Sequence, residues 1–281
     1  MTIAEFIYTV LLKPKPLQLA ANAVIRTIIP RTVRYGAVTI VLNPRDAVIS
    51  GALTFRQYER DETALVQKVL KKGMTVLDIG ANIGFYTAQF AHSITPSGTV
   101  YAFEPDPECH SFLLQTIAAN SFTNVHPIQA AASSKDGSME LYTSSQNRGD
   151  NRLYGNEMAD GSTTVKVLCL DNFLAERKVR QIDFIKIDVQ GFEGSVLAGL
   201  EQTIRQSKPL TILMEFWPDG LQRAGTNPAS LLRQLQSWGM ILNQLGSNGT
   251  TTAIEDIESY IAKYPGRKYS NIVATKSGLG G

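Results

Sequence analysis

Residues 76–87, Val-Leu-Asp-Ile-Gly-Ala-Asn-Ile-Gly-Phe-Tyr-Thr, constrain the fold more than any other part of the chain. The run predicts a buried strand that ends at Asp78, followed by a tight turn through Gly80 and Gly84. A helix-like segment, 85–91, starts directly after the turn, so backbone N–H groups at its beginning face a bound ligand. The acid at the strand end favours a ligand with an ammonium group or hydroxyls over a bare pyrophosphate.

A second acid completes this predicted ligand site. Residues 99–103, Thr-Val-Tyr-Ala-Phe, read as a buried strand that ends in Glu104. An acid at the tip of the second strand of a doubly wound sheet accepts hydrogen bonds from ribose hydroxyls. The glycine turn and Glu104 together predict a ligand that contains a nucleoside.

The glycine pattern argues against a dinucleotide. Counted from Gly80, the fingerprint G-x-G-x-x-G would place glycines where the chain has Asn82 and Phe85. A nicotinamide-dependent oxidoreductase is therefore a weak alternative at this point.

Strand and helix patterns alternate along the rest of the chain, which indicates an α/β fold with a mostly parallel sheet covered on both faces. Seven sheet strands are expected, at Thr75–Ile79, Thr99–Phe103, Val125–Ala130, Ile182–Ile187, Thr211–Phe216, Ile241–Leu242 and Asn271–Thr275. Helices are expected at Thr63–Leu70, Pro107–Ala118, Gly194–Ile204 and Ala229–Trp238. Ser138–Thr143 and Thr164–Leu168 are predicted to form a hairpin around the polar loop Ser144–Ser162.

The N-terminal part differs in charge from the rest. Residues 1–35 hold five basic residues and one acid, whereas the whole chain has a formal net charge of only +2. We predict an accessory, largely helical segment over 1–54 and the main domain over 55–281. Two interpretations of 1–35 stay open: packing on the core or against a second copy in a homodimer, and peripheral contact with a membrane.

Location and nucleic-acid binding are predicted from what the sequence lacks. Neither apolar run near the N-terminus reaches the roughly 18–20 residues that a spanning helix needs. No cleavage site of a signal peptide is recognisable, so a cytoplasmic protein is expected. The near-neutral charge predicts no nucleic-acid partner.

The fourth predicted strand carries the candidate catalytic residues. Lys186 and Asp188 are two residues apart, so both side chains lie on one face of the strand. Asp188 ends the strand, where open α/β sheets place ligand-binding and catalytic groups. Glu215, near the end of the fifth strand, is a second candidate base. An ion pair is the alternative role for Lys186, and a favourable charge at a helix start is the alternative for Glu193.

Five motifs in order make the chain resemble the FkbM family of S-adenosylmethionine (SAM)-dependent methyltransferases over roughly residues 55–275. They are Asp78–Gly84, Phe103–Pro105, Leu170–Asp171, Lys186–Glu193 and Met214–Phe216. The resemblance implies a class I Rossmann-like fold with a seven-stranded sheet. It also implies methyl transfer from SAM to a hydroxyl of a small molecule, such as a sugar or a natural-product glycoside. This chain has Gln190 and Phe192 where the commonest family form has Glu and His.

On this basis each candidate residue receives an expected role. Asp78, Gly80, Asn82 and Gly84 would hold the methionine part of SAM, Glu104 the ribose, and Asp106 the region near the adenosine. Asp188 would accept the proton of the hydroxyl, with Glu215 as the alternative base and Lys186 orienting the carboxylate or the acceptor.

Several alternatives remain. A non-catalytic SAM-binding interaction module is the main one. No metal is predicted, although Asp171, Asp188, Glu193 and Glu215 on one rim would suit a hard divalent cation. The three histidines, His92, His110 and His126, are expected to be structural or at the surface. Arg148, Asn151, Arg152 and Tyr154 of the polar loop, together with Trp217, are candidates for acceptor contacts.

Overall fold

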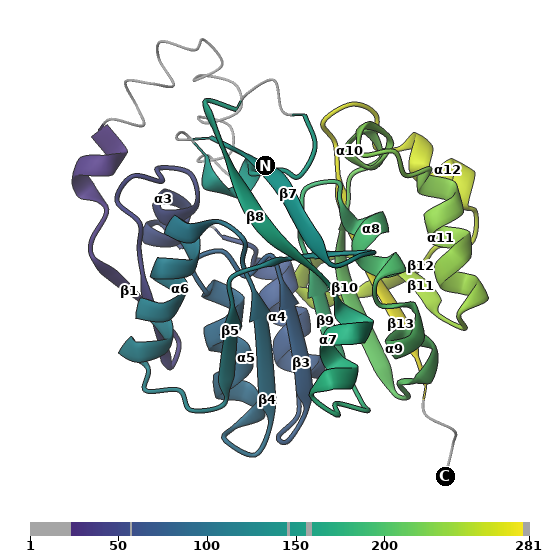
Figure 1. Cartoon of the computed structure of the whole chain (residues 1–281), viewed down its shortest axis with the longest axis horizontal. Helices are drawn as coiled ribbons and strands as arrows, with labels where there is room; N and C mark the ends of the chain where they lie inside the picture. Colours follow the sequence, from purple (N-terminus) through teal and green to yellow (C-terminus); the bar gives the residue numbers. More distant parts are fainter. Residues whose placement is uncertain (1–23, 57, 145–146, 156–158, 278–281) are drawn as a thin grey trace.

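A computed structural model describes residues 24–56, 58–144, 147–155 and 159–277. Within these ranges the largest sheet has eight strands in the order β12-β11-β13-β10-β9-β3-β4-β5 (Figure 1). The strands are β3 (Thr75–Ile79), β4 (Thr99–Phe103), β5 (Val125–Ile128), β9 (Phe184–Ile187), β10 (Leu210–Phe216), β11 (Ile241–Leu245), β12 (Thr251–Ala253) and β13 (Ser270–Lys276). Strands β5, β4, β3, β9 and β10 pair in parallel, and β13, β11 and β12 pair antiparallel at one edge.

The expected α/β Rossmann-like architecture is confirmed. All seven predicted strands lie in the large sheet, and β3 and β4 have the predicted bounds. The eighth strand, β12, was not expected. It has three exposed residues and extends the sheet only by pairing with β11 at the edge.

Helices cover both faces of the sheet (Figure 1). One face packs in a hydrophobic cluster with α3 (Ile49–Thr54), α4 (Arg60–Val69), α5 (Phe85–Ile94) and α6 (Pro107–Ala119). The other packs with α7 (Leu170–Glu176), α8 (Glu193–Ala198), α9 (Glu201–Gln206), α10 (Pro218–Arg223), α11 (Pro228–Ser237) and α12 (Ile257–Ala262). Successive strand residues alternate between these clusters, as Val76 and Leu77 do, because side chains of a strand point to opposite faces.

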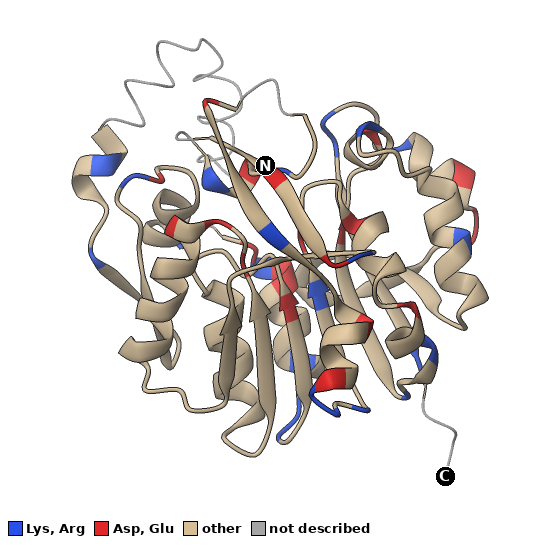
Figure 2. Cartoon of the chain, in the orientation of Figure 1, with Lys and Arg blue, Asp and Glu red and all other residues tan. Residues whose placement is uncertain are grey.

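The same alternation gathers three charged side chains on the face that α4 and α5 cover. Val76, Phe184 and Leu213 pack in the hydrophobic cluster that contains α4 and α5. Asp78, Lys186 and Glu215 each follow one of these residues by two positions, so their side chains lie on the same face of the sheet. Asp78 and Lys186 are also register partners of the neighbouring strands β3 and β9. Figure 2 shows acidic and basic segments adjacent in this central part of the sheet.

Two smaller sheets flank the large one. The predicted hairpin is confirmed as β7 (Gly137–Thr143) and β8 (Gly161–Cys169), which form a three-stranded sheet with β6 (Ala131–Ser133). Near the N-terminus, β1 (Thr32–Tyr35) pairs with β2 (Val38–Val41). Single turns of 3₁₀ helix occur at η2 (Arg148–Asp150) and η3 (Ser247–Gly249).

The accessory segment shares the core of the main domain where it is described. Val38, Ile40, Ile49 and Leu53 pack in the same cluster as α4 and α5. Most of the stretch expected to contact a membrane or a second copy, residues 1–23, lies outside the described residues, so both interpretations stay predictions, as does the division at residue 54. Among the described residues, none of the helices has the length and apolar character to cross a membrane.

The expectation of one continuous helix over Gly194–Ile204 is wrong. The segment forms two short helices, α8 and α9, that meet at Gly199 and Leu200. At Gly199 the chain runs so close to β6 that an added Cβ would lie 2.0 Å from the carbonyl oxygen of Ser133. Asp171 then accepts hydrogen bonds from the backbone N–H groups of Gln202 and Thr203, which starts α9 separately.

Candidate functional site

A cavity of about 290 Å³ lies at the carboxyl ends of β3, β4, β9 and β10, beside the start of β13. This volume is near the lower limit of typical small-molecule pockets. Seven of the nine predicted site residues line the cavity, namely Asp78, Gly80, Asn82, Glu104, Lys186, Asp188 and Glu215. Gly84 and Asp106 do not line it. The topology thus brings most of the predicted donor and catalytic groups to one place.

The glycine turn forms one wall. Gly80 has φ +86°, and its N–H and that of Ala81 both donate to the carbonyl oxygen of Phe103, at 3.0 Å each. A Cβ on Gly80 would lie 2.0 Å from the carbonyl oxygen of Asp188. Glycine is therefore required here by conformation and by the close approach of the β9 end. Gly84 instead begins α5 and packs against Leu113 of α6.

Asp78 lies at the bottom of this wall. Its side chain is 1% exposed, and its Oδ2 accepts a hydrogen bond of 2.5 Å from the Thr87 hydroxyl. Its Oδ1 has no hydrogen-bond partner among the described residues. Burial raises the pKa of Asp78 to about 6, although the charge of Lys186 opposes the shift. A buried acceptor without a partner at a cavity wall indicates a ligand with a hydrogen-bond donor.

Glu104 organises the opposite side of the turn. Its two carboxylate oxygens accept hydrogen bonds from the backbone N–H groups of Asn82 and Asp106, at 2.8 Å each. Burial raises the pKa of Glu104 to about 8, against the effect of these hydrogen bonds. Each oxygen retains a second lone pair for a ligand hydroxyl. The carboxylate therefore both fixes the left-handed turn at Asn82 (φ +50°) and presents acceptors to the cavity.

Asp106 has a different place from the one expected. One of its oxygens caps α6 by accepting from the N–H groups of Glu108 and Cys109. The other accepts from Arg148 at 3.1 Å and Asn151 at 2.7 Å. The residue is buried behind the cavity wall, where it fastens the β7–β8 connection to α6. Asp106 does not line the cavity, so this position does not support its predicted contact with an adenosine.

The β7–β8 connection covers part of the cavity. Arg148 and Asn151 line it, and Arg148 is also paired with Glu108 at 2.8 Å. Arg152 and Trp217 do not line it; the Arg152 guanidinium lies 4.6 Å from the centre of the Trp217 ring. Trp217, a candidate for acceptor contacts, instead packs in the core: its indole is only 6% exposed and donates to the carbonyl oxygen of Gly266.

Lys186 and Asp188 form the centre of the cavity. The Lys186 ammonium lies 3.0 Å from Asp188 Oδ2 and 4.7 Å from the centre of the Tyr86 ring. Burial alone lowers the pKa of Lys186, but the negative charges of Asp188, Glu59 and Asp78 together raise it. Burial would raise the pKa of Asp188, but Lys186 and a hydrogen bond from Gln190 lower it. Asp188 is thus a carboxylate and Lys186 an ammonium at neutral pH, which confirms the ion pair considered for Lys186.

Gln190 links the two candidate bases. Its amide nitrogen donates to Asp188 Oδ1 at 2.9 Å and to Glu215 Oε2 at 2.6 Å. The backbone of Gln190 is left-handed (φ +55°), and the Tyr154 hydroxyl holds its carbonyl oxygen at 2.6 Å. Burial, followed by the charges of Asp188 and Glu193, raises the pKa of Glu215 well above its usual value. The pKa values of the two candidate bases are therefore shifted in opposite directions, so that Asp188 is the more acidic of the two.

The four acids considered for a cation do not converge. Asp171 caps α9, away from the cavity, and Glu193 Oε1 accepts from the N–H groups of Val189 and Gly191, inside the turn that follows β9. These local hydrogen bonds are the physical reason why Asp171 and Glu193 are not on a shared rim. Within the described part of the chain, no group of three or more His, Cys, Asp or Glu residues is arranged to hold a metal ion.

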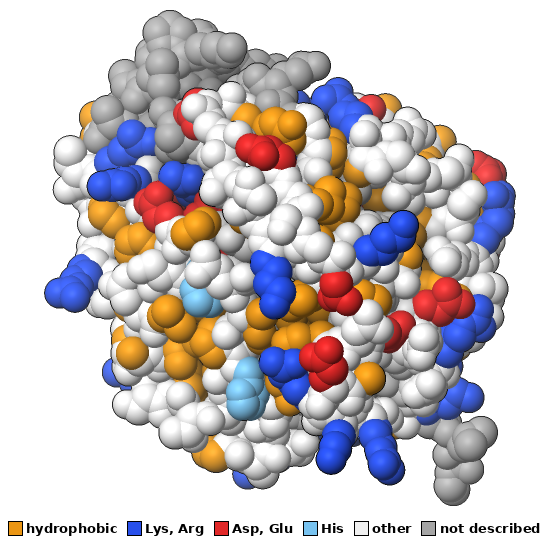
Figure 3. All heavy atoms as spheres, viewed as in Figure 1, with side chains coloured by type: hydrophobic (Ala, Val, Ile, Leu, Met, Phe, Trp, Pro, Cys, Tyr) orange, Lys and Arg blue, Asp and Glu red, His pale blue; other side chains and the backbone are white. Residues whose placement is uncertain are grey.

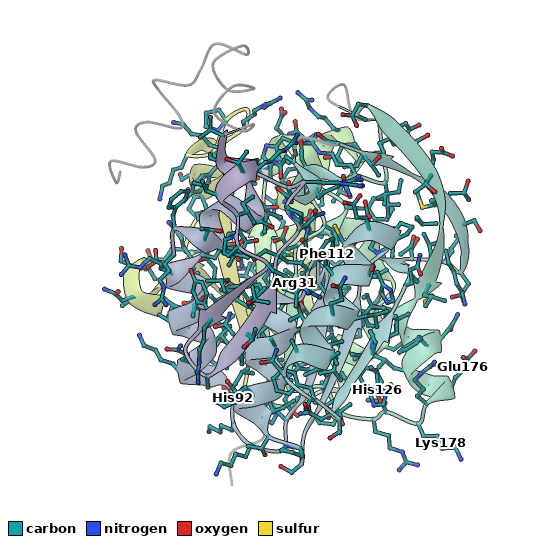
Figure 4. All side chains as sticks on the ribbon, turned by 90° about the vertical axis from the view of Figure 1, so that its left-hand side faces the viewer. Arg31, His92, Phe112, His126, Glu176 and Lys178 are labelled. Atoms are coloured by element: carbon teal, nitrogen blue, oxygen red, sulfur yellow. The ribbon has the colours of Figure 1, made fainter. Side chains whose placement is uncertain are left out.

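The histidines lie away from the cavity. His92 is in the last turn of α5 and His126 in the β5 strand, and Figure 4 shows both near the end of the sheet where the parallel strands begin. His110 is in α6, and none of the three lines the cavity. Their expected structural or surface placement agrees with these positions.

Sequence reasoning missed a second group of cavity residues. Tyr58, Glu59 and Glu62 come from the start of α4, and Tyr86 comes from α5. Asn271 at the start of β13 donates to Glu62. Glu59 and Glu62 precede the helix predicted at 63–70, and only the packing of α4 over β9 and β10 shows that they face the cavity.

Comparison with known proteins gives consistent matches. The family model described as "Methyltransferase FkbM domain" matches residues 78–265. The 2-O-methyltransferase NoeI of Sinorhizobium fredii is 27% identical over 165 residues, which are 51% of this chain and 64% of that protein. The 31-O-demethyl-FK506 methyltransferase FkbM of Streptomyces tacrolimicus is 29% identical over 164 residues, 47% of this chain and 61% of that protein. Both matches span less than two thirds of the relative's length. A solved methyltransferase FkbM from Methylobacillus flagellatus is 14% identical, with a TM-score of 0.45 over 92% of this chain and 59% of that one.

Proposed function

The chain belongs to the FkbM methyltransferase family, and from this premise we propose that it transfers the methyl group of SAM to a hydroxyl of a sugar or a natural-product glycoside. One observation carries the proposal: the glycine turn, Asp78, Glu104 and Asp188 line a single cavity at the carboxyl ends of the central strands. Two relatives named above carry O-methyl transfer in their names, which supports a hydroxyl as the acceptor. Family membership removes the oxidoreductase alternative.

The residues present fit SAM. Its ammonium group can donate to the unpartnered Oδ1 of Asp78, and its ribose hydroxyls can donate to Glu104. The absence of a side chain at Gly80 lets the ligand approach the backbone closely. SAM supplies a methyl group on a sulfonium, which is a good leaving group, so the difficult chemistry belongs to the cofactor.

The protein then has two tasks, to place the acceptor oxygen and to receive its proton. We assign proton acceptance to Asp188, since its lowered pKa keeps it ionised, whereas the pKa of Glu215 is raised. Lys186 holds one oxygen of Asp188 at 3.0 Å and Gln190 the other at 2.9 Å, so the carboxylate is fixed in orientation. These roles for Asp188, Glu215 and Lys186 are proposals.

Gln190→Glu is expected to shift the pH dependence of turnover. The amide that stabilises the Asp188 carboxylate would be replaced by a third carboxyl group, which raises the pKa of Asp188. Because the base must be deprotonated, the acidic limb of the kcat profile should move to higher pH. Gln115→Glu, on the exposed side of α6, is the matched control and should leave the profile unchanged. If the acidic limb of the kcat profile does not shift in Gln190→Glu, Gln190 does not control the pKa of Asp188.

The proposed activity is tested by release of S-adenosylhomocysteine (SAH) from SAM with a panel of glycosides. We expect SAH release that depends on at least one acceptor, with methylated product detected by mass spectrometry. If SAM binds but no acceptor in a broad sugar and glycoside panel is methylated, the non-catalytic SAM-binding module becomes the better description.

A further inference from the structure

The half of the cavity away from Glu104 carries three carboxyl groups, Glu59, Glu62 and Glu215, which we call the acidic end. Glu59 and Glu62 come from the start of α4, and Glu215 comes from β10. Glu215 and Asn271 are register partners of β10 and β13, and the Asn271 amide donates to Glu62. The acidic end is therefore contiguous, and it adjoins Asp188 through the Gln190 amide.

The acidic end holds three carboxyl groups, and Lys186, whose positive charge acts on all three, is shared with Asp188. The ammonium of Lys186 is paired with Asp188, and the Arg148 guanidinium is paired with Asp106 and Glu108. None of the three glutamates forms an ion pair within the described residues. Burial raises the pKa of Glu59 to about 7 and also raises the pKa values of Glu62 and Glu215, although the charge of Lys186 opposes the shift at each of them. Carboxyl groups that share one cation in a cavity, with pKa values raised by burial, are typical of functional sites.

The Tyr86 hydroxyl gives a second, independent observation. Tyr86 lines the cavity and is 4% exposed, and its hydroxyl has no hydrogen-bond partner among the described residues. After burial, the charges of Glu59 and Glu62 contribute most to the raised pKa of Tyr86, so the hydroxyl lies close to the acidic end. An unpartnered buried hydroxyl at this position indicates a ligand that can bond to it.

The arrangement suits an organic cation better than a metal ion. Over the described ranges, the carboxyl groups are not grouped closely enough to ligate a metal. An ammonium group has three donors, which matches several separated acceptors. Tyr269, 58% exposed at the edge of the cavity, offers a ring face to a sugar or to a cation.

We propose that the methyl acceptor is a polyhydroxylated compound with an ammonium group near the methylated hydroxyl, as in an amino sugar, and that Glu59, Glu62 and Glu215 bind this group. The proposal rests on the proposed methyl transfer to a hydroxyl and specifies its substrate. The ammonium group is bound and not methylated, and the hydroxyl proton passes to Asp188. Carboxylated acceptors are disfavoured, because a negative group would face the three carboxyls.

Calorimetry on the full-length chain saturated with SAH tests this preference without requiring turnover. The probes are methyl 2-amino-2-deoxyglycosides of the gluco, galacto and manno series, each paired with its N-acetyl derivative, together with the methyl uronides. We expect at least one amine to bind about tenfold more tightly than its N-acetyl partner, and the uronides to bind most weakly. Glu59→Gln and Glu62→Gln should each reduce that preference, whereas Glu176→Gln, on the surface of α7 in Figure 4, should not.

Equal or tighter binding of the N-acetyl glycosides or uronides would overturn the proposal, and so would the absence of binding by every amine. Both glutamine variants are checked by thermal unfolding, and a folded Glu59→Gln or Glu62→Gln that keeps the full preference would also overturn it. SAH binding is measured first in the same cell. A failure to bind SAH would therefore count against the cofactor site, separately from the acceptor preference.

Discussion

Asp188→Asn is expected to retain SAM binding and to lose turnover by about 10²- to 10⁴-fold, the usual contribution of a positioned general base. An amide cannot accept the hydroxyl proton, yet it occupies the same volume and can still receive a hydrogen bond from Gln190. The side-chain contacts of Asp188 are to Lys186 and Gln190 and not to the glycine turn or Glu104, so the cofactor half of the cavity should stay intact. The loss should appear in kcat, measured as SAH release at saturating SAM.

Two further measurements make this result specific. Asp219→Asn changes an ion pair with Arg223 on α10 and should leave turnover unchanged. Thermal unfolding of Asp188→Asn shows whether Lys186, which loses its partner, destabilises the fold. If a folded Asp188→Asn variant has turnover near that of the unsubstituted chain, Asp188 is not the base and another group accepts the proton.

The cofactor half of the site could be predicted from sequence because its residues lie directly after strands that the sequence pattern reveals. Asp78, the glycines and Glu104 each follow a strand whose pattern is clear, and parallel strands bring their carboxyl ends together. The glycine turn also carries its own conformational requirement at Gly80. Asp106 was placed less well, because its capping of α6 and its bonds to Arg148 and Asn151 depend on how a distant loop folds back.

The acceptor half could not be predicted in the same way. Glu59 and Glu62 face the cavity only because α4 packs over β9 and β10, and Glu215 meets Asn271 only through the antiparallel pairing with β13. The replacement of Glu by Gln190 was visible as a departure from the family pattern, but its bridging of two carboxyl groups is a tertiary contact. Sequence reasoning alone therefore left the acceptor to the family resemblance.

The surface adds little to the choice of acceptor. On the face shown in Figure 3, basic and acidic side chains of the described residues alternate without forming a continuous basic area. This agrees with the small net charge of +2. The absence of a nucleic-acid partner and the cytoplasmic location stay predictions. The proposed substrate rests on the residues inside the cavity.

Glu104→Ala is expected to weaken SAM binding more strongly than any other single change in the cofactor half. The two carboxyl oxygens can each accept a hydrogen bond from a ribose hydroxyl, at about 1 kcal/mol each, so the loss of both weakens affinity about 10- to 100-fold. The substitution also removes the acceptor that holds the N–H groups of Asn82 and Asp106. Glu176→Ala, at a position whose side chain is 76% exposed, is the control for loss of a glutamate.

We propose that SAM binds in the cavity between the glycine turn and Glu104. Calorimetric titration of the unsubstituted chain and of folded Glu104→Ala with SAM, side by side, tests it most directly. We predict one SAM bound per chain, with affinity at least about tenfold weaker in Glu104→Ala. Equal affinity in the two proteins, or no SAM binding by the unsubstituted chain, would contradict the account.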